Sequence, residues 1–297
     1  MSISAMIVGA ALALQPVQEA PTQVEDVVVS GRALEEQVRS FLGEVALPEP
    51  NLRPARWHNR VCVGVANLRQ EPAQLVIDRI SQVALDVGLT PGEPGCVPNI
   101  LIVATNDGSA AASGLFQARR RAFLPGGGDM VRRRSAFDEF RDGEAPIRWW
   151  HVVSPIDRST GKLATRLPGF DPPLTAGLGS RLRTDIRSDL NRVVIILDLT
   201  KLEDLNFQQI ADYSAMIALS QVDSRSDFSN YDSILALMPS QRDRSGITEW
   251  DMAYLNALYD AELNLKRKNH EYGTIASLME RAEIRVRRQE SASTPTH

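Results

Sequence analysis

The chain has 297 residues, of which 43% are hydrophobic and 24% are charged. These proportions are ordinary for a globular protein, and the length suits one large domain or two small ones. The formal net charge of −4 gives no overall attraction to nucleic acid, which is therefore not expected as a partner.

The first twenty residues have the pattern of an export signal. Residues 5–14 form an apolar run of small and branched side chains, which is too short to cross a bilayer and is typical of a signal-peptide core. A buried N-terminal helix is the alternative. Cleavage would follow Ala13 or Ala20. Since no later segment has the length of a transmembrane helix, we expect a periplasmic or secreted protein without a transmembrane segment.

Two segments flank the expected domain. Residues 21–52 are rich in Pro, Glu and Gln and are predicted to form a linker, with one short apolar patch at 27–29. The final residues, 291–297, are mostly small and polar, which predicts a disordered tail. The domain between these segments covers residues 53–290, and it contains no internal repeat.

A strand–helix–strand unit opens the domain. Apolar runs at 61–65 and 99–104 predict buried strands, and an amphipathic helix is expected between them at 72–87. If the strands are parallel, the crossover brings Cys62 and Cys96 to the same end of the sheet. An oxidising compartment would then favour a Cys62–Cys96 disulfide, worth about 3–4 kcal/mol in the chain-entropy model. Two independent buried thiols are the alternative.

A variable, basic stretch follows at 110–145. It contains arginine triplets at 119–121 and 132–134. Four phenylalanines are interleaved with the arginines: Phe116, Phe123, Phe137 and Phe140. Such a surface could bind an anionic partner, such as lipid headgroups or lipopolysaccharide. We favour a solvated loop, whose phenylalanines pack onto the domain and whose nearby carboxylates offset the charge.

Two more strands are predicted in the middle of the chain. Residues 147–153 are expected at an edge of the sheet, and 193–198 form a short apolar strand that is expected to be buried. A Pro- and Gly-rich loop connects them over 154–180. Trp149 and Trp150 must point to opposite faces of their strand, so we expect one in the core and the other partly exposed.

Three helices complete the predicted fold. The first starts at Asn206, with Gln209 three residues later as the second half of an N-cap pair. The second starts at Thr248, with Asp251 at the matching position, and the third begins near Thr274. The expected fold is therefore α+β: a mixed sheet that begins with a βαβ unit, a central helix, and further helices at the C-terminus.

This order of elements resembles the upper half of a metzincin-type zinc peptidase of the matrixin kind. Residues 233–235 (Ser-Ile-Leu) resemble the Ser-Ile-Met of the family's methionine turn, and residues 248–259 resemble its closing helix. Similar arrangements occur in bacterial secreted domains of unknown function that look like degenerate matrixins. The resemblance covers residues 55–290 and implies a zincin-like fold.

The residues that would hold the zinc are replaced. An active metzincin carries His-Glu-x-x-His on the central helix, because residues i and i+4 share a face and reach one metal. If residues 218–220 match the family's Ala-Leu-Gly, the two histidine positions hold Tyr213 and Ile217. Ser214 then takes the general-base position, and Asp223 takes the position of the third ligand.

No other register restores the metal site. A shift by one residue places Asp212 and Met216 at the histidine positions, and Leu235 stands where the turn methionine would be. The resemblance therefore implies a zincin-like domain without zinc, and no metal or other cofactor is expected.

Four residues remain weak candidates for a non-standard catalytic site, and none is assigned a catalytic role. Asp212, Tyr213 and Asp223 fall where the family places its site. His151 lies in the expected edge strand, along which the family's substrates run, although a lone histidine there is more often structural. The favoured function is a non-catalytic binding or scaffold domain of the cell envelope, whose retained cleft holds a peptide or an envelope protein. A divergent hydrolase built from these four residues is the alternative.

Overall fold

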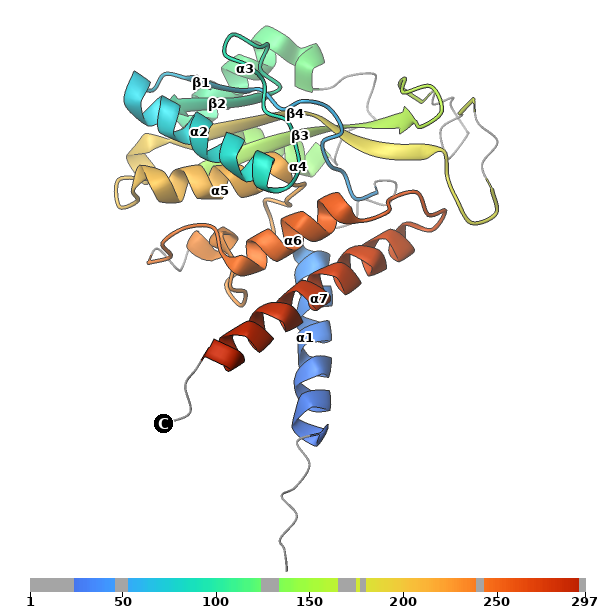
Figure 1. Ribbon diagram of the computed structural model, residues 1–297. Helices are drawn as coiled ribbons and strands as arrows, with labels where there is room; N and C mark the ends of the chain where they lie inside the picture. Colours follow the sequence, from blue (N-terminus) through green and yellow to red (C-terminus); the bar gives the residue numbers. More distant parts are fainter. Residues whose placement is uncertain are drawn as a thin grey trace, which may run out of the picture.

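The computed structural model describes residues 24–45, 53–123, 134–164, 175–176, 180–238 and 243–293. The predicted export signal and its cleavage sites lie outside these residues. In the described part of the chain, seven α-helices and one open, mixed sheet of four strands form an α+β fold (Figure 1). The predicted fold class is therefore confirmed at this level.

The sheet has the strand order β1-β2-β4-β3. Strands β1 (Val63–Ala66), β2 (Ile100–Thr105) and β4 (Ile186–Asp198) run parallel, and β3 (Ile147–Asp157) pairs antiparallel to β4 at the sheet edge. The parallel pair β1–β2 is the predicted βαβ start, since α2 (Gln70–Asp86) connects the two strands. The predicted edge position of the strand that starts at Ile147 is also confirmed.

The disulfide between Cys62 and Cys96 is present, as predicted. Each cysteine lies just before a strand of the parallel pair, and their Cα atoms are 6.2 Å apart, within the usual range for a disulfide. Gly92 packs against this bridge so closely that a Cβ atom there would lie 2.5 Å from the Cys96 Sγ atom. A side chain at this position would push the bridge aside.

The antiparallel pair is longer than predicted. Strand β3 continues past a β-bulge between Val152 and Val153 as far as Asp157, and β4 starts at Ile186. The extra residues include a proline and several charged side chains, which have low strand propensity, so pairing between the two strands decides their structure. The expected loop over 154–180 therefore begins after Asp157.

One face of the sheet is covered by α3 (Gly108–Phe123) and α4 (Arg134–Asp142). These helices occupy the stretch that was expected to be a loop, but its phenylalanines do pack onto the domain. Four aromatic side chains of α3 and α4 form a small core around Trp150: Phe116, Phe123, Phe137 and Phe140. Trp149 is buried on the opposite face, so the expectation of one partly exposed tryptophan was wrong.

The opposite face is covered by α2 and the central helix α5 (Phe207–Leu219), which follows a short 3-10 turn, η2 (Leu199–Lys201). The capping box predicted for α5 is present, because Asn206 and Gln209 each accept from the other's backbone N–H. Every residue of α5 from position 209 onwards is buried. The helix is therefore a core element of the larger hydrophobic cluster.

The C-terminal helices are α6 (Glu249–Asp260) and α7 (Lys268–Ser293). Helix α6 has the predicted capping box between Thr248 and Asp251. Helix α7 begins six residues before the predicted Thr274, so that Gly273 lies inside the helix. It also extends into the expected tail as far as Ser293.

The expected linker over 21–52 was wrong, because most of it forms helix α1 (Val24–Val45). Figure 1 shows that α1 lies against α6 and α7 and extends away from the sheet. Its buried residues follow helical spacing and belong to the main core: Leu34, Val38, Phe41, Leu42 and Val45. The ring of Phe41 contacts four other aromatic rings, those of Phe228, Tyr231, Trp250 and Tyr254.

Three arginines attach the α6–α7 connection to the sheet, and we call them the arginine clamp: Arg53, Arg56 and Arg158. Arg53 donates to the carbonyl oxygens of Leu265 at 2.6 Å and Lys266 at 2.8 Å. Arg56 donates to Leu258 at 2.6 Å and also to the Tyr259 carbonyl. Arg158 donates to the Leu263 carbonyl. The bonds from Arg56 satisfy carbonyls that the end of α6 leaves without helical partners, and the other two arginines hold the segment that follows α6.

Candidate functional site

A cavity of about 260 Å³ lies where β3 begins, between this strand, α5 and the segment 223–238. Apolar and aromatic side chains form most of its wall: Phe140, Trp149, Tyr213, Phe228, Leu235 and Met238. Charged residues at its boundary come from three different elements: Glu139, Arg148 and Asp223. The cavity therefore lies between the edge strand and the central helix.

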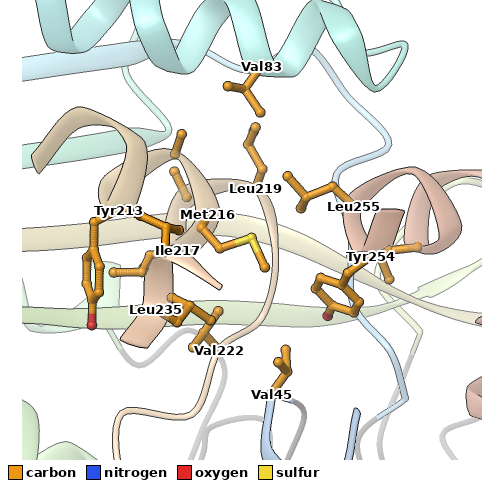
Figure 2. Packing of buried hydrophobic residues seen from close by; sticks show 14 of the residues in the cluster. Val45, Val83, Tyr213, Met216, Ile217, Leu219, Val222, Leu235, Tyr254 and Leu255 are labelled. Atoms are coloured by element: carbon orange, nitrogen blue, oxygen red, sulfur yellow. The ribbon is translucent and has the colours of Figure 1, made fainter. Parts of the chain in front are cut away.

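The two α5 positions that the metzincin resemblance assigned to zinc ligands hold packing residues. Tyr213 is buried, and its ring meets that of Trp149 edge-to-face, with centroids 6.2 Å apart. Ile217 follows one turn later and is fully buried. Figure 2 shows Tyr213 and Ile217 in the hydrophobic cluster that also contains Leu235. Burial raises the pKa of the Tyr213 phenol above its ordinary value, so its hydroxyl stays protonated at neutral pH.

Asp223 lines the cavity, but its carboxylate is engaged. The guanidinium of Arg225 donates from Nε to Oδ1 at 3.1 Å and from Nη2 to Oδ2 at 2.8 Å. The backbone N–H of Arg225 donates to Oδ1 as well, and the backbone N–H of Asp223 donates to the carbonyl of Val45 in α1. Asp223 is therefore neutralised in place, and helix α1 fixes the segment that carries it.

His151 is in β3, as predicted, but it is not part of the cavity wall. Its ring is buried, and Nε2 lies 2.8 Å from the backbone carbonyl oxygen of Ile217. An N–H on that nitrogen would donate to the carbonyl and tie the edge strand to α5. The contact gives His151 a structural role in holding β3 against the central helix.

Asp212 faces away from the cavity. It forms an ion pair with Arg79 of α2, and Gln208 donates to its Oδ2 at 3.1 Å. Gly246 lies so close to this carboxylate that a Cβ there would be 2.4 Å from Oδ2. Because neighbouring helical residues point about 100° apart, Asp212 joins α5 to α2 while Tyr213 points toward β3.

Of the four sequence candidates, the structure brings only Tyr213 and Asp223 to the same cavity. His151 lies in the core and Asp212 lies on the α2 side. Among the residues that the structure describes, no group of three or more His, Cys, Asp or Glu side chains could hold a metal ion. Ser214, at the position of the general base, is completely buried.

The turn beside the cavity is held by Asp251 of α6. Ser233 donates its hydroxyl to Asp251 Oδ1, and the backbone N–H of Ile234 donates to Oδ2 at 2.8 Å. Thr248 donates both its N–H and its hydroxyl to the same Oδ2 atom. These bonds set the start of the 3-10 turn η3 (Ile234–Leu237), whose Leu235 lines the cavity.

Sequence reasoning missed Arg148 as a residue of the site. It is only 3% exposed, and its described partners are neutral: the Ser109 hydroxyl at 3.0 Å and the carbonyls of Arg141 and Ala145, each at 3.3 Å. The sequence did contain a signal for Arg148, because it is a charged residue inside the apolar run 147–153. Phe228 and Met238 gave no comparable signal, because they come from irregular segments.

In the part of the chain that the structure describes, no helix has both the length and the apolar character needed to cross a membrane. Comparison of the chain with protein-family models, with curated proteins and with solved structures found no match.

Proposed function

We propose that this chain is an exported, non-catalytic, zincin-like domain that acts as a binding or scaffold module of the cell envelope. The cavity between β3 and α5 is its binding site, and an extended peptide segment is its ligand. One observation carries the proposal. The cavity has a mostly apolar wall, and Asp223, the one carboxylate at a position that the resemblance assigns to a zinc ligand, is bound by Arg225.

The edge of β3 supports a peptide ligand. The backbone N–H of Asp198 donates to the carbonyl of Pro146, which lies opposite it just before β3. Because hydrogen-bonded and non-bonded pairs alternate in an antiparallel ladder, the peptide groups of Ile147 and Trp149 face away from β4. Within the described residues, no other strand pairs with this part of β3. Ile147 and Trp149 are only 2% and 5% exposed, so a peptide that adds there as a further strand must displace the groups that cover them.

The size and wall of the cavity support an apolar side chain as the anchor. Small-molecule sites usually enclose about 300–1,000 Å³, so a cavity of about 260 Å³ suits a side chain better than a whole ligand. Aromatic rings from β3, α5 and the segment after α5 surround it, which favours an aromatic or branched aliphatic group. The charged groups at the boundary would contact the more polar flanks of the peptide.

The location in the cell envelope is part of the proposal. The disulfide between Cys62 and Cys96 supports an oxidising compartment. The apolar run at residues 5–14, which is typical of a signal-peptide core, supports export. The alternative, a divergent hydrolase, has less support because its candidate residues do not converge: two line the cavity and two are used in packing contacts elsewhere.

A displayed library of random decapeptides tests the binding function. Peptides enriched on the folded protein should share an aromatic or branched aliphatic residue. Met238→Trp, which fills the cavity from a half-buried wall position, should weaken their binding at least about tenfold, a loss of about 1.4 kcal/mol. Leu85→Trp is the matched control on the exposed face of α2 and should leave binding within about twofold.

Three results would contradict the proposal. Failure to enrich any peptide, or equal binding by both tryptophan variants, would remove the cavity as a peptide site. Zinc bound stoichiometrically by the purified protein, and lost in Asp223→Asn, would overturn the non-catalytic assignment.

A further inference from the structure

Three segments meet at the end of β3 that is remote from the cavity. They are residues 158–163, 180–185 and 264–267. Backbone hydrogen bonds join them: Arg158 N–H to Asp185 O at 2.7 Å, Thr184 N–H to Asn264 O at 2.8 Å, and Lys266 N–H to Leu182 O at 2.8 Å. In Figure 1 they form the right-hand end of the molecule, beyond the arrowhead of β3. We call this end the basic tip.

Two leucines are exposed on the basic tip. Leu182 is 78% exposed and Leu163 is 52% exposed. Only Val97 and Leu85 among the described large apolar side chains reach comparable exposure, and they lie on other elements. Both leucines lie on segments whose backbone is fixed by hydrogen bonds, so their exposure is set by the fold.

Exposed cations surround the leucines. Lys162 and Arg181 are direct sequence neighbours of Leu163 and Leu182, and Lys266 and Arg267 lie on the adjoining segment. None of these four cations forms an ion pair with a residue that the structure describes. Arg183 is also exposed, but it pairs with Glu262. The tip is thus locally cationic on a chain whose formal net charge is −4.

We infer that the basic tip binds the surface of an anionic lipid bilayer. Cations attract the negatively charged headgroups within a Debye length, and exposed leucines between them can enter the boundary of the acyl chains. A nucleic-acid site would need no exposed leucines, whereas at a bilayer surface they add apolar contact to the attraction between charges. This surface is independent of the proposed peptide site.

The tip and the cavity lie at opposite ends of β3. The strand has 11 residues, so at 3.3 Å per residue the two ends are about 33 Å apart. Binding through the tip therefore leaves the cavity open toward the aqueous phase. A bilayer-attached protein of this shape could capture a ligand away from the membrane surface.

Co-sedimentation of the full chain with vesicles tests the inference. Vesicles of phosphatidylcholine with 40% phosphatidylglycerol should retain the protein, and pure phosphatidylcholine should not. Because each cation near an anionic surface contributes about fivefold in affinity, neutralising four of them should weaken binding about a hundredfold or more. The variant replaces each tip cation by glutamine: Lys162→Gln, Arg181→Gln, Lys266→Gln and Arg267→Gln.

A matched control removes four exposed arginines from other surfaces: Arg119→Gln, Arg121→Gln, Arg285→Gln and Arg288→Gln. It should retain most of the vesicle binding, because the binding depends on the tip. Leu163→Ser with Leu182→Ser should weaken binding about tenfold while keeping the charge. The inference is wrong if wild-type protein does not sediment with anionic vesicles, if the control loses as much binding as the tip variant, or if the leucine variant binds like wild type.

Discussion

The two ends of β3 use their polar groups differently. At the far end, the arginine clamp donates to carbonyls between Leu258 and Lys266. Its guanidinium groups therefore bind the connection between α6 and α7. At the near end, β3 keeps outward-facing peptide groups beside a cavity of about 260 Å³. The difference shows that the arginines of the clamp serve architecture, unlike the exposed cations of the basic tip beside them, whereas the peptide groups at the near end have no further strand partner among the described residues.

The largest effect is expected from Asp251→Ala at the cavity end. The substitution leaves the buried donors of Ser233 and Ile234, and the half-buried N–H of Thr248, without an acceptor, and we expect a loss of about 3–5 kcal/mol of unfolding free energy. Urea denaturation measures it. Ser233→Ala removes only one donor and is expected to cost about 1–2 kcal/mol. Equal costs for the two variants would show that Asp251 does not organise the turn.

Arg56→Met tests the arginine clamp. Arg56 donates to two carbonyls at the end of α6, and burial lowers the pKa of its guanidinium, so the substitution removes partly buried charge-assisted hydrogen bonds. We expect a loss of about 2–3 kcal/mol. Arg183→Met breaks an exposed ion pair with Glu262 and should change stability by less than about 0.5 kcal/mol. Similar losses for both would mean that the clamp is no stronger than a surface ion pair.

The smallest effect is expected from Glu271→Gln, and it depends on pH. Burial raises the pKa of Glu271 above its usual 4.5, although Arg53 lies 2.9 Å from its carboxylate. A raised folded pKa means that the protonated carboxyl favours folding below pH 4.5. This contribution is lost as pH rises through the folded pKa, at about 1.4 kcal/mol per pKa unit.

Thermal unfolding at several pH values checks this prediction. The variant should gain stability relative to wild type as the pH rises above 4.5, and the difference should stop growing once Glu271 is ionised. A constant difference between the two proteins from pH 4 to pH 8 would contradict it.

The parts of the fold that could be predicted are those set by local chemistry. The N-caps at Asn206 and Thr248 are marked by residues three positions apart, and the positions of Cys62 and Cys96 follow from the parallel crossover. Helix α1 could not be predicted in the same way. Its apolar stripe is interrupted by charged residues and follows a proline-rich segment, and it is stable only because distant aromatic rings pack around Phe41.

The sequence predicted two of the residues that line the cavity, but it did not predict the other wall residues or the partners of the charged groups. Tyr213 and Asp223 were placed in the cleft by their alignment with the zinc ligands, and both line the cavity. The partners that decide their chemistry were not evident. Arg225, two residues further along the chain, neutralises Asp223. Arg79 of α2 forms an ion pair with Asp212 on the side of α5 that faces away from the cavity. Such pairings depend on side-chain directions that spacing along one helix does not reveal.

The place of α1 in the core constrains when the protein can fold. Ser40, beside Phe41, bonds Tyr231 across 191 positions, and the rings that enclose Phe41 extend into α6. The first helix of the domain therefore has no partners until most of the chain is available. The core around Phe41 can therefore close only after α6 has been synthesised.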